Sequence, residues 1–387
     1  MEKNGRLMSL DALRGADMLF IIGFSGVLVS LCQLLGFGKD CWLATQMSHV
    51  AWHGFRHHDT IFPLFLFLAG VSWPFSYASQ LAKGRTTAAI LRKMAFRVAA
   101  LVFLGLATAN FFAFKVAAFR YCSVLAHIGV CWAGAALLFM FVRSWKTRLA
   151  IAFALLLAHW ATLFFFTAPD AAALLASTDP DIARKVASYA AYGTDNFSFT
   201  GNIAGWIDRK FMPGHLHELV FDPEGFLTKV SGTALATMGA IAGELLRAKD
   251  ISGNRKTLLL AGAGAAALAL TFCWMPLCPV NKKLWTSTFV LASAAYSFLM
   301  LAIFYWIVDV KGFRRWTFFF RVIGMNSITI YVMMRFVGFP SMSRFFLSGV
   351  AGLGGKEWES FVICVGMIAV EWLVLLFLYR KNTFLKV

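Results

Sequence analysis

The chain has 387 residues, of which 59% are hydrophobic and only 14% are charged. Soluble domains carry about a quarter charged residues, so this composition excludes an ordinary soluble protein and indicates an integral membrane protein. Basic loops on the cytoplasmic side of a membrane explain the formal net charge of +17, and we expect no nucleic-acid partner.

Crossing a bilayer takes about 20 mainly apolar residues, and about ten segments of the chain have this character. We therefore expect an all-α polytopic membrane protein, folded as a single transmembrane domain over residues 1–387 and embedded in the lipid bilayer. The predicted spans cover residues 10–34, 60–82, 92–114, 122–142, 148–167, 226–247, 257–277, 287–309, 317–339 and 360–380.

The distribution of lysine and arginine among the short loops predicts the orientation. Every second loop, for example residues 83–93 and residues 247–256, is rich in these residues, whereas the loops between them carry few. Cytoplasmic loops have such an excess of positive charge. With ten spans, both termini are then cytoplasmic, in a bacterial inner membrane. Residues 49–59 and residues 168–225 face the periplasm.

The periplasmic segment over residues 168–225 is the only loop large enough to form a small subdomain. It begins with acidic residues and proline, including Asp170 and Asp179, and then becomes aromatic, with Tyr189 and Trp206 among others. A loop of this length is usually functional or disordered. Its aromatic content favours a packed lid over an external pocket.

Several polar residues lie inside predicted spans, where polar groups are costly. Arg14 follows Asp11 by three residues, so their side chains share one helix face. Arg14 either pairs with this acid at a helix start or holds an anionic group such as phosphate. Asn326 and Ser327 either join neighbouring helices or line a polar tunnel.

The loop before the eighth span carries Asn281, Lys282, Lys283 and Trp285. Lysines beside a tryptophan are typical of the belt at a membrane interface. The same lysines are also suited to an anion-holding site.

Four histidines crowd the stretch that ends at Asp59: His49, His53, His57 and His58. From these residues alone, a solvated loop ranks first. Catalysis by a histidine that Asp59 orients ranks second. A metal site ranks third, because the spacing matches no known metal signature, and we expect no metal.

Motifs along the chain resemble those of the heparan-α-glucosaminide N-acetyltransferase family, a group of transmembrane acyltransferases. Each motif is short, but together they follow the family's order over nearly the whole chain. They occupy residues 6–15 (RLMSLDALRG), 49–54 (HVAWHG), 59–70 (DTIFPLFLFLAG), 205–209 (GWIDR), 221–225 (FDPEG), 279–285 (PVNKKLW), 308–312 (VDVKG) and 324–328 (GMNSI).

The resemblance implies an enzyme that moves acetyl from cytosolic acetyl-CoA to the amino group of a terminal glucosamine across the membrane. It implies His49 as the catalytic histidine and Asp59 as its acid, and leaves the other three histidines as bystanders. His49 either takes the amine's proton or carries the acetyl group itself.

The resemblance also guides the expected binding residues. Arg14 would hold the CoA phosphates, and Asn326 and Ser327 would line a polar tunnel for acetyl-CoA. The candidates for the acceptor pocket, which takes a glycan or amino sugar, are Asp208, Asp222, Asn281 and Lys282. Family members are often homodimers, although no motif here specifies a dimer interface.

One position departs from the family pattern. Where the family commonly has Val-Leu-Gln-Arg, this chain reads Val124-Leu125-Ala126-His127, which favours a different acceptor. The chain lacks the large lumenal extension of animal members, so we expect a compact bacterial form. Three alternatives stay open: an O-acyltransferase for another cell-surface glycan, a transporter for a small anion or sugar, and a metal-dependent membrane hydrolase.

Overall fold

The computed structural model of the chain describes residues 7–109 and 119–385. Arg6, which opens the first motif, and residues 110–114 of the third predicted span lie outside these ranges. Within them the regular structure is helical and contains no β-strand, which confirms the predicted all-α class.

Seven of the described helices are long and apolar enough to cross a membrane, or eight if one broken pair of helices counts as a single span. That pair, over residues 317–336, bends by 65°. Each of the ten predicted spans contains a helix or a pair of helices, but the count of ten is not confirmed. The helix over residues 87–107 falls short because it contains three charged residues, Arg92, Lys93 and Arg97. In the helix over residues 228–247, polar and small residues lower the hydropathy.

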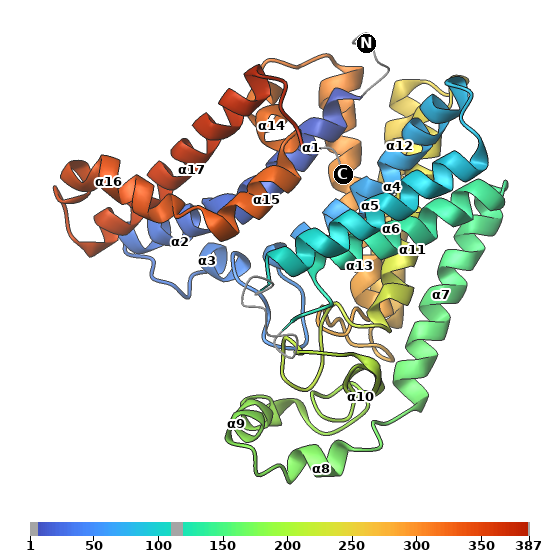
Figure 1. Cartoon of the computed structure of the whole chain (residues 1–387), viewed down its shortest axis with the longest axis vertical. Coiled ribbons are helices and arrows are strands. Elements are labelled where there is room, and N and C mark those ends of the chain that lie inside the picture. Colours follow the sequence, from blue (N-terminus) through green and yellow to red (C-terminus); the bar gives the residue numbers. More distant parts are fainter. Residues whose placement is uncertain (1–6, 110–118, 386–387) are drawn as a thin grey trace.

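A bundle of seven helices forms the larger part of the molecule (Figure 1). Helix α11 lies at its centre, because it packs against α4, α6, α7 and α13. The helices are α4 (His57–Ala82), α5 (Thr87–Ala107), α6 (Val124–Phe141), α7 (Trp145–Phe165), α11 (Thr228–Arg247), α12 (Gly253–Trp274) and α13 (Ser287–Phe304).

A second group of helices, built from both ends of the chain, lies beside this bundle (Figure 1). Helix α1 connects the two groups, since it packs against α14 as well as α4 and α13. The members are α1 (Met8–Leu19), η1 (Phe20–Phe24), α2 (Ser25–Leu34), η5 (Tyr305–Val310), α14 (Thr317–Gly324), α15 (Ser327–Phe336), α16 (Phe339–Ala351) and α17 (Lys356–Arg380).

The first span is one helical segment with a local break. A π-helical turn, η1, separates α1 from α2, and Gly23 within it has φ = 128°. Glycine adopts this conformation without a side-chain clash. The turn therefore bends the segment that the sequence predicted as continuous.

Short helices gather at one end of the bundle, shown at the bottom of Figure 1. They belong to the segment predicted as a subdomain, and its aromatic side chains form a separate core around Trp52, Phe199 and Phe221. The elements are α8 (Ala171–Leu175), α9 (Pro180–Ser188), η4 (Ala190–Tyr192) and α10 (Ile203–Phe211), whereas α3 (Trp42–Gln46) packs against α2.

Glycines allow α4 and α11 to touch backbone to backbone. A Cβ atom on Gly239 would lie 2.2 Å from the Phe67 carbonyl oxygen, and one on Gly243 would lie 2.2 Å from the Val71 oxygen. From the other side, a Cβ on Gly70 would lie 2.1 Å from the Ala236 oxygen. Small residues four apart bring membrane helices together in this way. This contact sets the position of α4, which carries Asp59 in its first turn.

Because a backbone atom cannot move aside as a side chain can, Gly239→Ala should force α4 and α11 apart. We expect destabilisation of about 1–3 kcal/mol, measured as a lower midpoint of thermal unfolding in detergent. Gly262→Ala is the matched control, since no atom lies within 4 Å of its added Cβ. Equal midpoints for the two variants would contradict the close contact.

Candidate functional site

His49 and Asp59 meet where the loop before α4 folds back over the first turn of that helix. Asp59 is fully buried, and its Oδ1 lies 2.7 Å from His49 Nδ1. Its Oδ2 accepts the Arg56 backbone N–H at 3.1 Å, which caps the helix. Because a carboxylate only accepts hydrogen bonds, Nδ1 of His49 donates to it, and in the neutral imidazole Nε2 then holds the lone pair. The His49 side chain is 53% exposed, so this nitrogen is accessible.

Lys282 approaches the same pair from the loop between α12 and α13. Its Nζ lies 3.1 Å from His49 Nδ1 and 3.5 Å from both His49 Nε2 and Asp59 Oδ1. Burial lowers the pKa of Lys282, although Asp59 and Glu224 act in the opposite direction. The side chains of Asp59, His49 and Lys282 thus lie within 3.5 Å of one another.

Asn281, the neighbour of Lys282, is fully buried and shapes the loop. Its Oδ1 accepts the Leu284 backbone N–H at 3.0 Å, and its Nδ2 lies 3.3 Å from His53 Nδ1. The Gly54 N–H also donates to the Val280 carbonyl at 2.8 Å. These bonds join the histidine loop to the lysine loop. The predicted role of Asn281 in acceptor binding remains a prediction.

Trp52 anchors the histidine loop to the subdomain. Its buried indole donates to the Phe197 carbonyl at 2.9 Å and packs edge-on against Tyr189, Phe199 and Phe221. Buried indoles need such a partner for their N–H. The anchor holds the His49 backbone against residues that are distant in the sequence.

His49, Asp59 and Lys282 line a cavity of about 520 Å³, here called the histidine cavity. The segment predicted as a lid forms part of its wall, through Tyr189 and Glu218 among others. The remaining polar and charged lining residues are His58, Thr108, Arg120, Ser123, His217, Glu224, Lys283, Tyr331 and Arg335.

Arg120 braces this wall by binding two acids. It contacts Asp222 through two bonds of 2.7 and 2.8 Å and also contacts Glu224. Burial acts to raise the pKa of Asp222, but hydrogen bonding to Arg120 outweighs it and holds that pKa below its usual range. Burial raises the pKa of Glu224 to about 7.

Asp208 lies one layer further from the cavity. Its two oxygens accept backbone N–H groups of Asp222 at 3.2 Å and Phe226 at 3.0 Å, and burial raises its pKa to about 6. Asp208 and Asp222 line neither cavity described here. Their predicted contact with the acceptor remains a prediction, and their bonds favour a role in positioning the wall.

The other histidines of the cluster diverge from one another. His57 Nε2 lies 3.2 Å from the Tyr296 hydroxyl, whereas the His58 ring lies 4.5 Å from the His49 ring at an angle of 55° and lines the histidine cavity. His127, at the position where the family pattern has arginine, is buried 4.5 Å from the Trp285 ring and lines neither cavity. Within residues 7–109 and 119–385, no group of three or more His, Cys, Asp or Glu residues could hold a metal ion.

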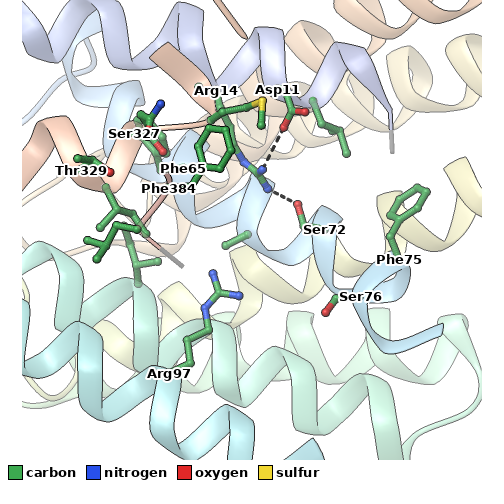
Figure 2. Close-up of a pocket in the computed structure, with 18 of the residues that line it drawn as sticks. Asp11, Arg14, Phe65, Ser72, Phe75, Ser76, Arg97, Ser327, Thr329 and Phe384 are labelled. Atoms are coloured by element: carbon green, nitrogen blue, oxygen red, sulfur yellow. Dashed lines mark hydrogen bonds and ion pairs between the residues drawn. The ribbon is translucent and has the colours of Figure 1, made fainter. Parts of the chain in front are cut away.

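A second cavity of about 720 Å³, here called the arginine cavity, contains Arg14, Arg97, Arg247, Asn326 and Ser327 in its lining. Figure 2 shows Arg14 and Arg97 reaching the same space from different walls. The Arg14 guanidinium contacts Ser72 and lies 3.6 Å from Asp11. The structure thus brings together the three residues predicted for donor binding.

Arg97 was not predicted from the sequence as a binding residue. Like Arg14, however, Arg97 is an arginine within a predicted span, and this feature could have identified it. Its guanidinium lies 4.3 Å from the centre of the Trp132 ring. Its Nε has no hydrogen-bond partner within the described part of the chain. Among the residues that the structure describes, Asp11 is the single acid in the lining of the arginine cavity, against three arginines.

The two cavities follow one another along the same helices. Helix α4 lines the histidine cavity with residues up to Phe62 and the arginine cavity with residues from Phe65 onward. The two sets of residues are therefore about one helical turn apart. Helices α5, α6 and α15 also contribute to both cavities in this way. A group bound across this turn would therefore connect the arginines to His49.

The sequence of this chain is similar to those of two known proteins. The chain is 28% identical to human heparan-α-glucosaminide N-acetyltransferase over 379 residues, covering 84% of this chain and 52% of the relative. It is 27% identical to the mouse protein of the same name over 378 residues, covering 84% of this chain and 54% of that relative. No family model matches. The chain spans about half the length of these curated relatives, and the similarity confirms the resemblance predicted from the motifs.

Arg120→Ala should destabilise the protein, because it leaves Asp222 buried without its counterion. Removing one partner of a buried ion pair costs about 3–5 kcal/mol, and the effect is measured as a lower unfolding midpoint in detergent. Arg184→Ala is the control, since the side chains of Arg184 and Asp181 are 79% and 73% exposed and such pairs contribute little. An equal change in the unfolding midpoints of both variants would contradict a stabilising role for the Arg120–Asp222 ion pair.

Proposed function

We propose that the protein is a transmembrane acetyltransferase, which transfers acetyl from cytosolic acetyl-CoA to the amino group of a glucosamine-type sugar on the periplasmic side. The observation that carries the proposal is the bond between His49 and Asp59 at the wall of one cavity, with an arginine-lined cavity along the same helices. The names of the two relatives, both N-acetyltransferases, support this class of reaction.

The location of the cavities supports the proposed sidedness. The arginine cavity is lined by Leu7 and Leu385, close to both termini, and by Arg247 from a basic loop. The lysine and arginine pattern assigns these parts to the cytoplasm. The histidine cavity lies at the opposite end of the same helices, beside the segment assigned to the periplasm. Donor and acceptor would thus enter from opposite sides.

The arginine cavity has the chemistry of a donor site. Guanidinium groups bind phosphate through paired N–H groups, and Arg14, Arg97 and Arg247 exceed the acids in this cavity. Asn326 and Ser327 offer polar groups on the path that leads toward His49. In this arrangement the phosphates of acetyl-CoA bind the arginines, and the thioester end points to the histidine cavity.

The contacts of His49 suit either of two transfer routes. With its Nδ1–H bonded to Asp59, Nε2 can take a proton from the amine. Alternatively, Nε2 attacks the thioester and carries the acetyl group to the amine. In both routes Asp59 stabilises the positive charge that develops on the ring. Lys282, 3.5 Å from Nε2, is placed to stabilise negative charge on the acetyl oxygen.

Replacing His49 by alanine should reduce acetyl transfer by at least about 100-fold, the lower limit for losing a general base. Asp59→Asn should also reduce it, because an amide cannot stabilise the cationic ring. The assay follows CoA release and the mass of acetylated glucosamine with purified protein. His215→Ala, an exposed histidine outside both cavities, is the matched control. Undiminished transfer by the His49 variant would contradict the proposal, and sugar uptake by proteoliposomes without CoA would favour a transporter.

Arg97→Ala should weaken acetyl-CoA binding about tenfold to hundredfold, as expected for a lost hydrogen bond to a charged group. Arg14→Ala should act in the same direction, and high salt should reduce the difference from the wild type. Titration of the purified protein with acetyl-CoA measures the dissociation constant. Arg92→Ala, an exposed arginine on the same helix α5, should bind as the wild type does. Unchanged binding by both cavity variants would exclude the arginine cavity as the donor site.

A further inference from the structure

Glu224 is a buried acid on the wall of the histidine cavity that the proposed transfer routes leave without a role. Its side chain is 10% exposed, and it lines the same cavity as His49 and Lys282. Its Arg120 partner already makes two bonds to Asp222. One carboxylate, that of Asp222, is enough to balance the positive charge of Arg120, so Glu224 is a second carboxyl group on one guanidinium.

An amino-sugar acceptor must lose a proton before it can react, and a carboxylate in the cavity could accept that proton. Aliphatic amines are largely protonated at neutral pH, and an ammonium nitrogen has no lone pair with which to attack an acetyl group. If His49 carries the acetyl group, its Nε2 is occupied and cannot also take the proton of the amine. The site then needs a second base that faces the same cavity.

We propose that Glu224 is this base: its carboxylate receives the ammonium group of the acceptor and takes one proton from it. This inference rests on the proposed acetyltransferase function and specifies the acceptor as an amine that is protonated when it binds. Neither the motifs nor the names of the relatives assign this role to Glu224.

The proposed step balances as follows. The ammonium group gives one proton to the Glu224 carboxylate, and the freed lone pair forms the N–C bond to the acetyl carbon. The bond from that carbon to its carrier, the CoA sulfur or His49 Nε2, breaks and its electron pair leaves with the carrier. The nitrogen loses a second proton, which the departing carrier accepts. Glu224 then releases its proton to water.

Charged and titratable groups on several elements face Glu224 and set its pKa. Burial raises this pKa, Arg120 opposes the rise, and Asp222 and Lys282 act in opposite directions. The Lys229 ammonium on α11 binds the backbone carbonyls of residues 224 and 225 rather than the carboxylate. On α15, Tyr331 and Arg335 line the same cavity. The resulting pKa of about 7 is close to that of an efficient base at neutral pH.

Two acceptors distinguish a base from a structural acid: glucosamine, and an alkoxyamine whose nitrogen is uncharged at neutral pH. In Glu224→Gln the amide oxygen can still accept from Arg120, so the fold is kept, as its unfolding midpoint will verify. At pH 7 we expect this variant to lose about 100-fold or more of its transfer to glucosamine. Its transfer to the alkoxyamine should stay within a few-fold of the wild type.

The pH profile provides a second readout. Wild-type transfer to glucosamine should rise as pH passes through about 7, the pKa of Glu224, because the base is active only when deprotonated. In Glu224→Gln this limb should be lost, and activity should return at higher pH as the free amine forms by itself. Glu224→Asp should restore part of the activity at pH 7. Glu359→Gln, a half-exposed acid at the start of α17, is the matched control.

The outcomes separate this inference from the function on which it rests. Equal losses with both acceptors, or undiminished transfer to glucosamine in Glu224→Gln, would overturn the role of Glu224 while the acetyltransferase activity stands. A wild-type protein that acetylates neither amine would overturn the proposed function and this inference with it.

Discussion

The carboxylate of Asp59 joins three parts of the chain. It caps the first turn of α4 through the Arg56 N–H, it binds His49 from the preceding loop, and it lies 3.5 Å from Lys282 of a loop more than 200 residues later. A buried carboxylate is costly unless such partners surround it. The need to satisfy this one group therefore positions both the histidine and the lysine. A helix held by close glycine contacts provides the fixed platform on which these partners meet.

The acids near the cavity have different functions because their environments differ. Asp222 is held ionised by Arg120, and Asp208 accepts backbone N–H groups that shape the 222–226 turn. Glu224 shares Arg120 with Asp222, and burial raises its pKa to about 7. Three acids within 17 positions of the chain thus have three functions: Asp222 pairs with Arg120, Asp208 holds the turn, and Glu224 can titrate. Their number alone would not have revealed this division.

Under the proposed function, the helices would serve a reaction whose two reactants enter from opposite sides of the membrane. Among the described residues, arginines outnumber acids three to one at the arginine cavity, where phosphate would be bound, whereas histidines, lysines, arginines and carboxyl groups line the other cavity together. Helices α4, α5, α6 and α15 are common to both. A cofactor arm could then connect the two chemistries without the protein moving the acetyl group by a large conformational change.

Local patterns in the sequence were sufficient for the class of protein, because a bilayer imposes long apolar helices on any chain that crosses it. Motifs also pointed to His49 with Asp59 and to Arg14 with Asn326 and Ser327, and the structure places each group in the lining of one cavity. The functions of these residues stay predictions. Hydropathy failed to indicate the π-helical break at Gly23, because one residue with positive φ hardly changes the apolar content of a span.

The tertiary structure decided which distant polar groups share a space. Arg97 lines the same cavity as Arg14, and Glu224 lines the same cavity as His49, only because α5 and the 222–226 turn pack where they do. It also placed Asp208 and Asn281 behind the cavity wall, where backbone groups occupy their oxygens. Spacing along a chain records neighbours on one helix face, whereas contacts between helices depend on packing that no single segment contains.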